Sequence, residues 1–213
     1  MIPVKESAQN TPNVKSGNSD STVAFPPIEG QISGSKKDVR GLKAPEIVVE
    51  KWITPKPNLT GFKGVIMVDF WATWCPPCRA SIPHSNELAD EFRDDLLIVG
   101  ISAEVMKDFE EGLKKHDLPL SKFHYTLALD TQRRLSSWVG VRGIPHVIVL
   151  SSDGIVRWQG HPARLDHNTM KQIILANKSF NGSNTVSQEN TTSTGNTVVL
   201  KPKTKRWTKK SNG

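Results

Sequence analysis

The most constraining feature of the chain is a short apolar run that leads into two closely spaced cysteines. The run, Val65–Trp71, predicts a buried central strand. It is followed by Cys75-Pro76-Pro77-Cys78, which holds both cysteines of the chain. Two cysteines placed at random among the 213 residues would lie three apart in about one percent of cases. Because proline is favoured in the first helical turn, we predict a helix that begins near Pro76 with Cys75 at its N-terminus.

This position of Cys75 favours thiolate chemistry. Unpaired N–H groups and the positive end of the helix dipole stabilise a thiolate, so we expect the pKa of Cys75 to fall below about 8.5. Cys78 lies one turn further and can place its sulfur beside the first. We expect Cys78 to be more buried and to resolve a mixed disulfide. Pro76 and Pro77 restrict the turn and should influence how readily the disulfide forms.

Strands and helices alternate along the middle of the chain. Strands are predicted at 46–53, 65–71, 96–102, 124–129, 146–150 and 155–159, and helices at 76–94, 105–116, 131–139 and 166–177. This alternation predicts an α/β fold with a parallel segment covered by helices on both faces. The turn residues 151–154 predict a hairpin that adds an antiparallel edge, so the central sheet should be mixed.

Composition divides the chain into three parts. Residues 1–40 are polar and predict a flexible leader, residues 41–178 predict the folded domain, and residues 179–213 predict a disordered tail. The formal net charge is +7, and the tail alone holds six Lys or Arg against one Glu. The nearly neutral domain gives no support for a nucleic-acid-binding face, and no specific nucleic-acid partner is expected. The basic tail is either a solvated end or a contact for an anionic surface.

The composition also limits the classes of protein and site. No apolar run approaches the ~18–20 residues that cross a bilayer, and two cysteines exclude a disulfide-dense scaffold. A static structural disulfide, half of a zinc site that uses His84, and a peroxidatic cysteine are alternatives for the cysteine pair. Zinc lacks a second ligand pair at finger-like spacing, and the peroxidatic reading lacks its usual lead-in sequence.

Three segments carry a resemblance to a known family. Residues 68–79, VDFWATWCPPCR, resemble the active-site segment of thioredoxin-like proteins and are most similar to the TlpA/ResA group of bacterial thiol-disulfide oxidoreductases. Residues 141–145, VRGIP, resemble the thioredoxin cis-proline loop. Residues 41–45, GLKAP, resemble the segment that opens TlpA-like and peroxiredoxin-like domains. The resemblance covers about residues 41–178 and implies a thioredoxin fold.

The resemblance implies roles for individual residues. Cys75 would be the attacking thiolate and Cys78 the resolving cysteine. Pro145 would be cis and face the disulfide, and the backbone of Ile144 would pair with the substrate as a short strand. Asp69, six residues before Cys75, matches a buried carboxylate of the family. Burial would raise its pKa and let it accept the proton of Cys78.

Further positions match the surroundings of the family's site. Trp71 and Trp74 match positions that pack around the cysteines, and Trp74 and Pro76 would contact the substrate. His146 follows the cis-proline and would either tune the redox chemistry, as Pro77 would, or face a neighbouring strand. Ser81 stands where many ResA-like proteins have a glutamate, which makes Asp69 the sole acidic candidate.

These features predict a thiol-disulfide oxidoreductase without cofactor or metal, acting as a monomer. Its partners would be protein thiols and disulfides and an upstream thiol reductant. The Arg-Gly-Ile-Pro loop favours a reductant of protein disulfides. The alternatives are a dithiol oxidase or isomerase, and a non-catalytic binding module whose disulfide is structural.

Localisation is expected to follow the resemblance. The start of the chain lacks the apolar segment of a secretory signal peptide. TlpA-like proteins mostly work outside the cytoplasm, often tethered by an N-terminal segment. We therefore expect a periplasmic or cell-envelope protein if a signal or anchor was removed, and a cytoplasmic one otherwise. Apocytochrome thiols, and with them cytochrome c maturation, are among the expected targets.

Overall fold

A computed structural model of the chain describes residues 23–189. Three strands, β2, β3 and β5, have the predicted bounds, because all three are mostly apolar and buried along almost their whole length. The elements in chain order are β1 (Lys51–Trp52), β2 (Val65–Trp71), α1 (Pro76–Glu91), β3 (Leu96–Ser102), α2 (Met106–Lys115), η1 (Leu120–Lys122), β4 (Thr126–Leu129), α3 (Arg134–Val139), β5 (His146–Leu150), β6 (Val156–Gly160), η2 (Pro162–Arg164) and α4 (His167–Glu189).

The strands form one mixed sheet in the order β1-β4-β3-β2-β5-β6. Neighbours β2, β3 and β4 are parallel, whereas β5 is antiparallel to β2, β6 to β5 and β1 to β4. The predicted mixed sheet and the predicted β5–β6 hairpin are therefore confirmed. The carboxyl end of central strand β2 leads into the loop that carries the cysteines.

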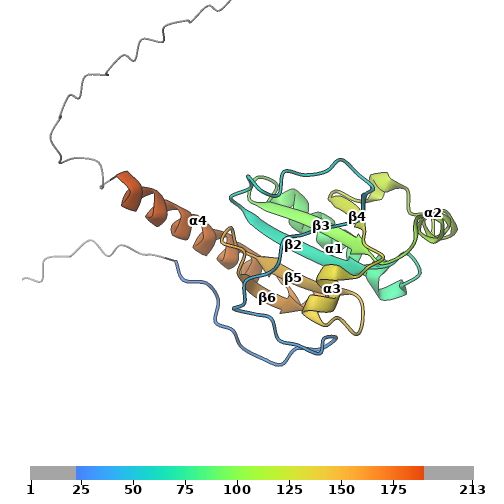
Figure 1. The fold of residues 1–213 in the computed structure, drawn as a ribbon, viewed down its shortest axis with the longest axis horizontal. Helices are drawn as coiled ribbons and strands as arrows, with labels where there is room; N and C mark the ends of the chain where they lie inside the picture. The colour runs from blue at the N-terminus through green and yellow to red at the C-terminus, as the bar shows by residue number, and fades with distance from the viewer. Residues whose placement is uncertain (1–22, 190–213) are drawn as a thin grey trace, which may run out of the picture.

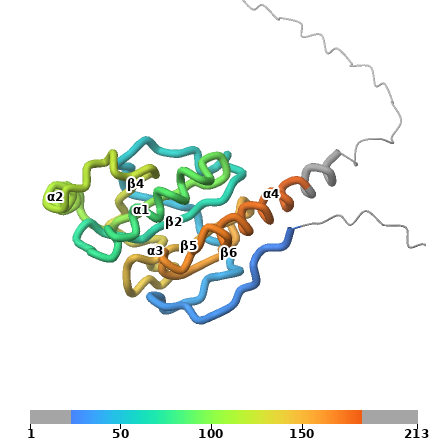
Figure 2. The backbone as a smooth tube through the Cα atoms, turned by 180° about the vertical axis from the view of Figure 1, so that it is seen from behind, coloured from blue at the N-terminus to red at the C-terminus, as the bar shows by residue number. Residues whose placement is uncertain are grey.

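Helices cover both faces of the sheet, as predicted. On one face, Met67 of β2 packs in a cluster with Leu88 of α1 and Ile173 of α4. On the other face, Phe70 of β2 packs in a cluster with Leu135 of α3. Figure 1 shows the segment before β2 and α3 on the near side of the sheet, and Figure 2 shows α1 and α4 from behind. Because α1 lies against β2, the end of that strand and the start of that helix meet at one point.

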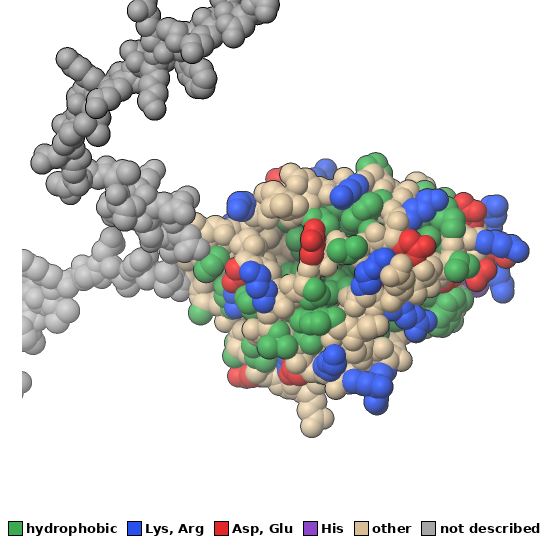
Figure 3. Space-filling view, in the orientation of Figure 1, with side chains coloured by type: hydrophobic (Ala, Val, Ile, Leu, Met, Phe, Trp, Pro, Cys, Tyr) green, Lys and Arg blue, Asp and Glu red, His purple; other side chains and the backbone are tan. Residues whose placement is uncertain are grey.

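The surface of the folded part has no large region of one charge on the face drawn in Figure 3. Apolar side chains gather toward the centre of this face, and Lys and Arg side chains lie mainly around them. Within residues 23–189, no helix is both long and apolar enough to cross a membrane.

The folded domain begins earlier than predicted, because part of the expected leader packs on it. Ser35 forms a bridge with Val141, and the Lys36 N–H donates to the Gly140 carbonyl at 2.8 Å. Val39 is buried in the core cluster of the α3 face. The predicted boundary at residue 41 was therefore wrong for this segment. Its polar composition does not indicate packing, because several of its contacts are made by backbone groups.

The next residues pair with the start of β6. The Gly41 N–H donates to the Val156 carbonyl at 2.8 Å, and the Val156 N–H donates to the Leu42 carbonyl at 3.0 Å. Ala44 continues the pairing by donating to the carbonyl of Gly154 at 2.9 Å. This short ladder joins residues 41–44 to the outer edge of the sheet.

Two further element predictions were wrong. The predicted strand at 46–53 is reduced to the two residues of β1, because only Lys51 and Trp52 pair with β4, although Ile47 and Val49 pack on the α3 face as alternate strand residues would. Helix α4 continues to Glu189 rather than ending at 177, so the start of the expected tail is helical. The basic cluster of the tail lies outside the described residues.

Candidate functional site

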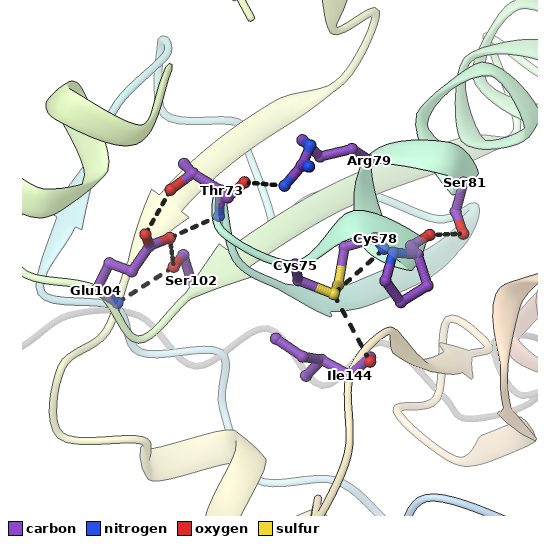
Figure 4. Close-up of a disulfide and its surroundings, with 9 residues drawn as sticks. Thr73, Cys75, Cys78, Arg79, Ser81, Ser102, Glu104 and Ile144 are labelled. Atoms are coloured by element: carbon purple, nitrogen blue, oxygen red, sulfur yellow. Dashed lines mark hydrogen bonds between the residues drawn. A yellow bond between two sulfur atoms is a disulfide. The ribbon is translucent and has the colours of Figure 1, made fainter. Parts of the chain in front are cut away.

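The two cysteines form a disulfide at the start of α1. Cys75 is the N-cap residue of this helix, and its sulfur accepts a hydrogen bond from the Cys78 N–H at 3.2 Å (Figure 4). Pro76 and Pro77 fill the first helical positions, where they lack the N–H that would otherwise need a partner. Both prolines are exposed beside the disulfide.

Exposure does not distinguish the two cysteines. Cys75 is 2% exposed and Cys78 is 3% exposed, so the prediction that Cys78 is the more buried one was wrong. Their surroundings differ instead. The Cys75 sulfur lies 3.7 Å from the Ile144 carbonyl oxygen, in the loop before β5.

This loop has the backbone that the resemblance implied. The peptide bond between Ile144 and Pro145 is cis, and Pro145 is buried. Ile144 packs against the cluster that contains Cys75 and Cys78. The structure thus brings together residues that are 69 positions apart in the chain.

The two tryptophans that flank the site have different environments. Trp71 is 4% exposed, and its ring lies 5.7 Å from Phe109 and 5.2 Å from Phe123 between centroids. Trp74, directly before Cys75, is 62% exposed. Trp71 therefore belongs to the core beneath the site, whereas Trp74 offers an aromatic surface to a molecule that approaches the disulfide.

Asp69 is buried between two apolar clusters on the α1 face. Alternation along β2 gives it the same face as Met67, which packs against α1, and as Trp71, which packs with the cysteines. One of its carboxylate oxygens has no hydrogen-bond partner among the described residues. Burial raises the pKa of Asp69 to about 7. The carboxyl group can therefore gain or lose a proton near neutral pH.

His146 lies on the opposite face of the sheet from Asp69. It is paired in register with Phe70, so the two side chains share the α3 face. Its Nε2 atom lies 3.1 Å from the side-chain nitrogen of Gln159 on β6. Burial, and next the charge of His161, lower the pKa of His146 to about 4. His146 thus faces a neighbouring strand and is neutral at physiological pH.

Glu104 is a residue of the site that the sequence analysis missed. Its carboxylate accepts hydrogen bonds from the Thr73 N–H at 2.8 Å, the Thr73 hydroxyl at 2.5 Å and the Ser102 hydroxyl at 2.8 Å (Figure 4). Because Thr73 is two residues before Cys75, this carboxylate fixes the loop that carries the disulfide. A signal existed: Glu104 follows the buried strand β3, whose carboxyl end lies beside that of β2.

Two other contacts hold the same loop. The guanidinium of Arg79 donates to the Thr73 carbonyl at 2.8 Å. Helix α2 approaches Thr73 at Gly112, where an added Cβ atom would lie 1.9 Å from the Thr73 hydroxyl oxygen. Thr73 is therefore held from three sides, by β3, α1 and α2.

A groove of about 280 Å³ opens beside the disulfide. Trp74 and Ile144, which flank the sulfur of Cys75, form part of its wall. Its wall combines apolar side chains with two acidic residues, Glu104 and Asp130, and with two exposed arginines, Arg133 and Arg142. The groove can hold a partly apolar chain segment next to the reactive bond.

The described residues also contain one group that is compact enough to hold a metal ion. It consists of His84 and Glu87 on α1 and His167 at the start of α4. The group is separate from the disulfide, whose two sulfurs are bonded to each other.

Comparison with known proteins places this geometry in a family. Residues 41–159 match the AhpC/TSA family. The chain is 29% identical over 140 residues to the thiol-disulfide oxidoreductase ResA of Bacillus cereus (strain ATCC 10987 / NRS 248), covering 63% of this chain and 76% of that protein. It is 36% identical over 95 residues to a thiol:disulfide interchange protein DsbE homolog of Paracoccus denitrificans, covering 43% and 47%.

A solved structure shows the same relationship in three dimensions. It is a crystal structure assigned as a thiol:disulfide interchange protein DsbE from Chlorobium tepidum, with a TM-score of 0.52 and 27% identity. The match covers 65% of this chain and 97% of that one. The thioredoxin fold predicted from the sequence is confirmed. The chain belongs to the AhpC/TSA family and is a thioredoxin-like thiol-disulfide oxidoreductase of the ResA/DsbE type.

Proposed function

We propose that this oxidoreductase reduces protein disulfides. The Cys75 thiolate attacks one sulfur of a substrate disulfide, which forms a mixed disulfide and releases the other substrate sulfur as a thiolate. The Cys78 thiolate then attacks the Cys75 sulfur and releases the second substrate thiol. Two electrons pass to the substrate, and an upstream thiol reductant restores the Cys75–Cys78 dithiol.

The observation that carries the proposed direction is the sparse support for a thiolate at Cys75. A strongly oxidising site stabilises its reduced form, usually with several donors or cations around the attacking sulfur. Among the described residues, the Cys75 sulfur has one backbone N–H donor, and it faces the Ile144 carbonyl oxygen. The guanidinium of Arg79 donates to the Thr73 carbonyl rather than to the sulfur, and His146 is neutral and lies on the other face of the sheet.

The remaining residues receive roles that fit this direction. Asp69, with its pKa near 7, accepts the proton of Cys78 when that cysteine resolves the mixed disulfide. Pro145 lacks an N–H and keeps a donor away from the sulfurs, and the Ile144 backbone pairs with the substrate. Trp74 and Pro76 contact the substrate from the other side, where both are exposed.

The redox midpoint of the cysteine pair tests the direction. Trp71 and Trp74 flank the site, so tryptophan fluorescence should follow equilibration against dithiothreitol or glutathione buffers. A midpoint near or below about −250 mV is expected for a reductant. A midpoint of about −120 to −180 mV would assign a dithiol oxidase or isomerase instead.

Two cysteine variants test the mechanism. Cys75→Ser should abolish insulin reduction, because it removes the attacking sulfur. Cys78→Ala should retain attack but trap the partner as a mixed disulfide. Insulin reduction by Cys75→Ser, or a cysteine pair that resists reduction, would identify a structural disulfide in a binding module.

We further place the protein outside the cytoplasm, acting on thiols such as those of apocytochromes. The support is the similarity to ResA and DsbE proteins and to the TlpA-like group. Trapping with Cys78→Ala in the native host should recover an envelope protein with a pair of cysteines. Recovery of cytoplasmic partners alone would contradict this placement.

A further inference from the structure

A cluster of histidines and glutamates joins α1 to the start of α4. His84, Glu87 and Glu91 lie on one side of α1, at spacings of three and four residues. His167 is the first residue of α4, and its ring centroid lies 5.7 Å from that of His84. One ligand atom each of His84, Glu87 and His167 lie within 4.8 Å of one another.

Each of the two imidazoles has a hydrogen bond at one ring nitrogen, which leaves the other nitrogen for a metal ion. Nε2 of His84 donates to the Leu165 carbonyl at 2.8 Å, since a carbonyl can only accept, and in the neutral imidazole Nδ1 then has a lone pair for a metal ion. Nδ1 of His167 is bonded to the Glu91 carboxylate, which leaves Nε2 as the acceptor, 3.8 Å from Glu87 Oε2. A partner that holds the second ring nitrogen is the usual companion of a ligating histidine.

The two carboxylates of the cluster also favour a bound cation. Within residues 23–189, the ion pairs of Glu87 and Glu91 are both with His167, and neither carboxylate pairs with a lysine or arginine. Glu87 and Glu91 therefore bring two carboxylates to the region between the helices.

We propose that His84, Glu87 and His167 bind a divalent transition metal ion, of which Zn²⁺ is the representative. Two imidazole nitrogens and a carboxylate oxygen form a borderline donor set, and water fills the fourth position. Zinc–ligand bonds of about 2.0–2.1 Å place tetrahedral ligand atoms about 3.3 Å apart. The ligand atoms of the cluster lie up to 4.8 Å apart, and the exposed Glu87 side chain can move to shorten this separation. Glu91 acts as a positioning residue that fixes the tautomer of His167.

The ion would clamp α1 to α4. Both helices cover one face of the sheet, and α1 carries the disulfide at its start. His84 is six residues beyond Cys78, which is about 9 Å along the helix axis. The ion would therefore stabilise the packing of the two helices without contacting the disulfide. The proposed site does not depend on the direction of the redox reaction.

Zinc titration of the oxidised, tag-free protein tests the site, because the disulfide keeps both thiols from binding metal. Competition with a chromogenic chelator should give one equivalent of Zn²⁺, and the ion should raise the thermal unfolding temperature. Mg²⁺ should do neither, because it prefers oxygen ligands. His84→Gln and His167→Gln should each weaken zinc binding at least about tenfold, and Glu91→Gln about tenfold to a hundredfold.

His124→Gln is the matched control, since His124 also pairs with a carboxylate on α1, that of Asp90, but lies outside the cluster. It should bind zinc as the unchanged protein does. Circular dichroism checks that every variant is folded. The proposal is overturned if the unchanged protein takes up less than one equivalent at 1 mM free Zn²⁺ (about the upper limit of weak sites), or if all histidine variants bind alike.

Discussion

The carboxylate of Glu104 accepts hydrogen bonds from both the backbone N–H and the hydroxyl of Thr73, at 2.8 and 2.5 Å. These bonds join the segment after β3 to the loop before Cys75. Hydrogen bonds to an ionised acceptor are worth more than neutral ones, about 1.5–3 kcal/mol each net. The position of the attacking sulfur therefore depends on a residue that does not contact it.

Replacing this carboxylate should loosen the loop. Glu104→Ala is expected to lower the free energy of unfolding by about 2–3 kcal/mol and to slow insulin reduction, because Thr73 loses both partners. Glu111→Ala is the control, since Glu111 makes only an exposed pair with Lys107 and should change stability by less than about 0.5 kcal/mol. Urea unfolding and insulin turnover measure the two effects, and equal losses in both variants would contradict the assignment.

The buried carboxyl of Asp69 should make stability depend on pH. Its pKa is raised to about 7 from 3.8, so the folded protein binds a proton that the unfolded chain releases between these values. The stabilisation of the folded protein by this bound proton is fully present below pH 4, falls as the pH rises, and is lost above pH 7. Asp69→Asn removes the loss in free energy of unfolding that ionisation of the buried carboxyl causes, which is at most about 4 kcal/mol.

In the oxidised protein, the free energy of unfolding of Asp69→Asn minus that of the unchanged protein should therefore be larger at pH 8 than at pH 5. Urea unfolding at both pH values measures the difference. A gain of the same size at pH 5 and pH 8 would show that Asp69 does not titrate in this range.

The same substitution should change the reaction rate in the opposite direction. If Asp69 accepts the proton of Cys78, the rate of the resolving step rises with pH through about 7, and Asp69→Asn lowers it by about a hundredfold and removes this rise. Stopped-flow reduction of a mixed disulfide measures the step. Asp90→Asn, an exposed carboxylate on α1, should keep the profile of the unchanged protein.

Trp74 should affect substrate binding more than folding. Because its side chain is 62% exposed beside the disulfide, Trp74→Ala should raise KM for a protein substrate about three- to tenfold and change stability by less than about 0.5 kcal/mol. Leu120→Ala removes another exposed apolar side chain, on η1, and should leave KM unchanged. An unchanged KM in the Trp74 variant would exclude this side chain from the substrate surface.

The sequence predicted the parts of the fold that have a strong local pattern. Strands β2 and β3 are almost wholly apolar, and Cys75-Pro76-Pro77-Cys78 combines chemistry and helix start in four residues. Contacts between distant segments were not accessible in this way. Glu104 meets Thr73 from 31 positions away, and nothing local to Ser35 predicts its bridge with Val141.

The histidines show the same limit. The sequence indicates His84 as a zinc ligand only together with the cysteines, because His84 lies six residues beyond Cys78. The fold instead places His84 beside His167, which is 83 positions away. Only the packing of η2 and α4 against α1 creates this pair.

The pairing of residues 41–44 with β6 has a consequence for self-association. An outer strand with free N–H and carbonyl groups is a template on which another chain can add a strand. Gly41 and Leu42 occupy these groups at Val156, so the start of β6 is already paired within its own chain. Proteolysis between Ala44 and β1 that released the preceding segment would uncover this edge, and the protein would lose its resistance to aggregation before it lost its disulfide.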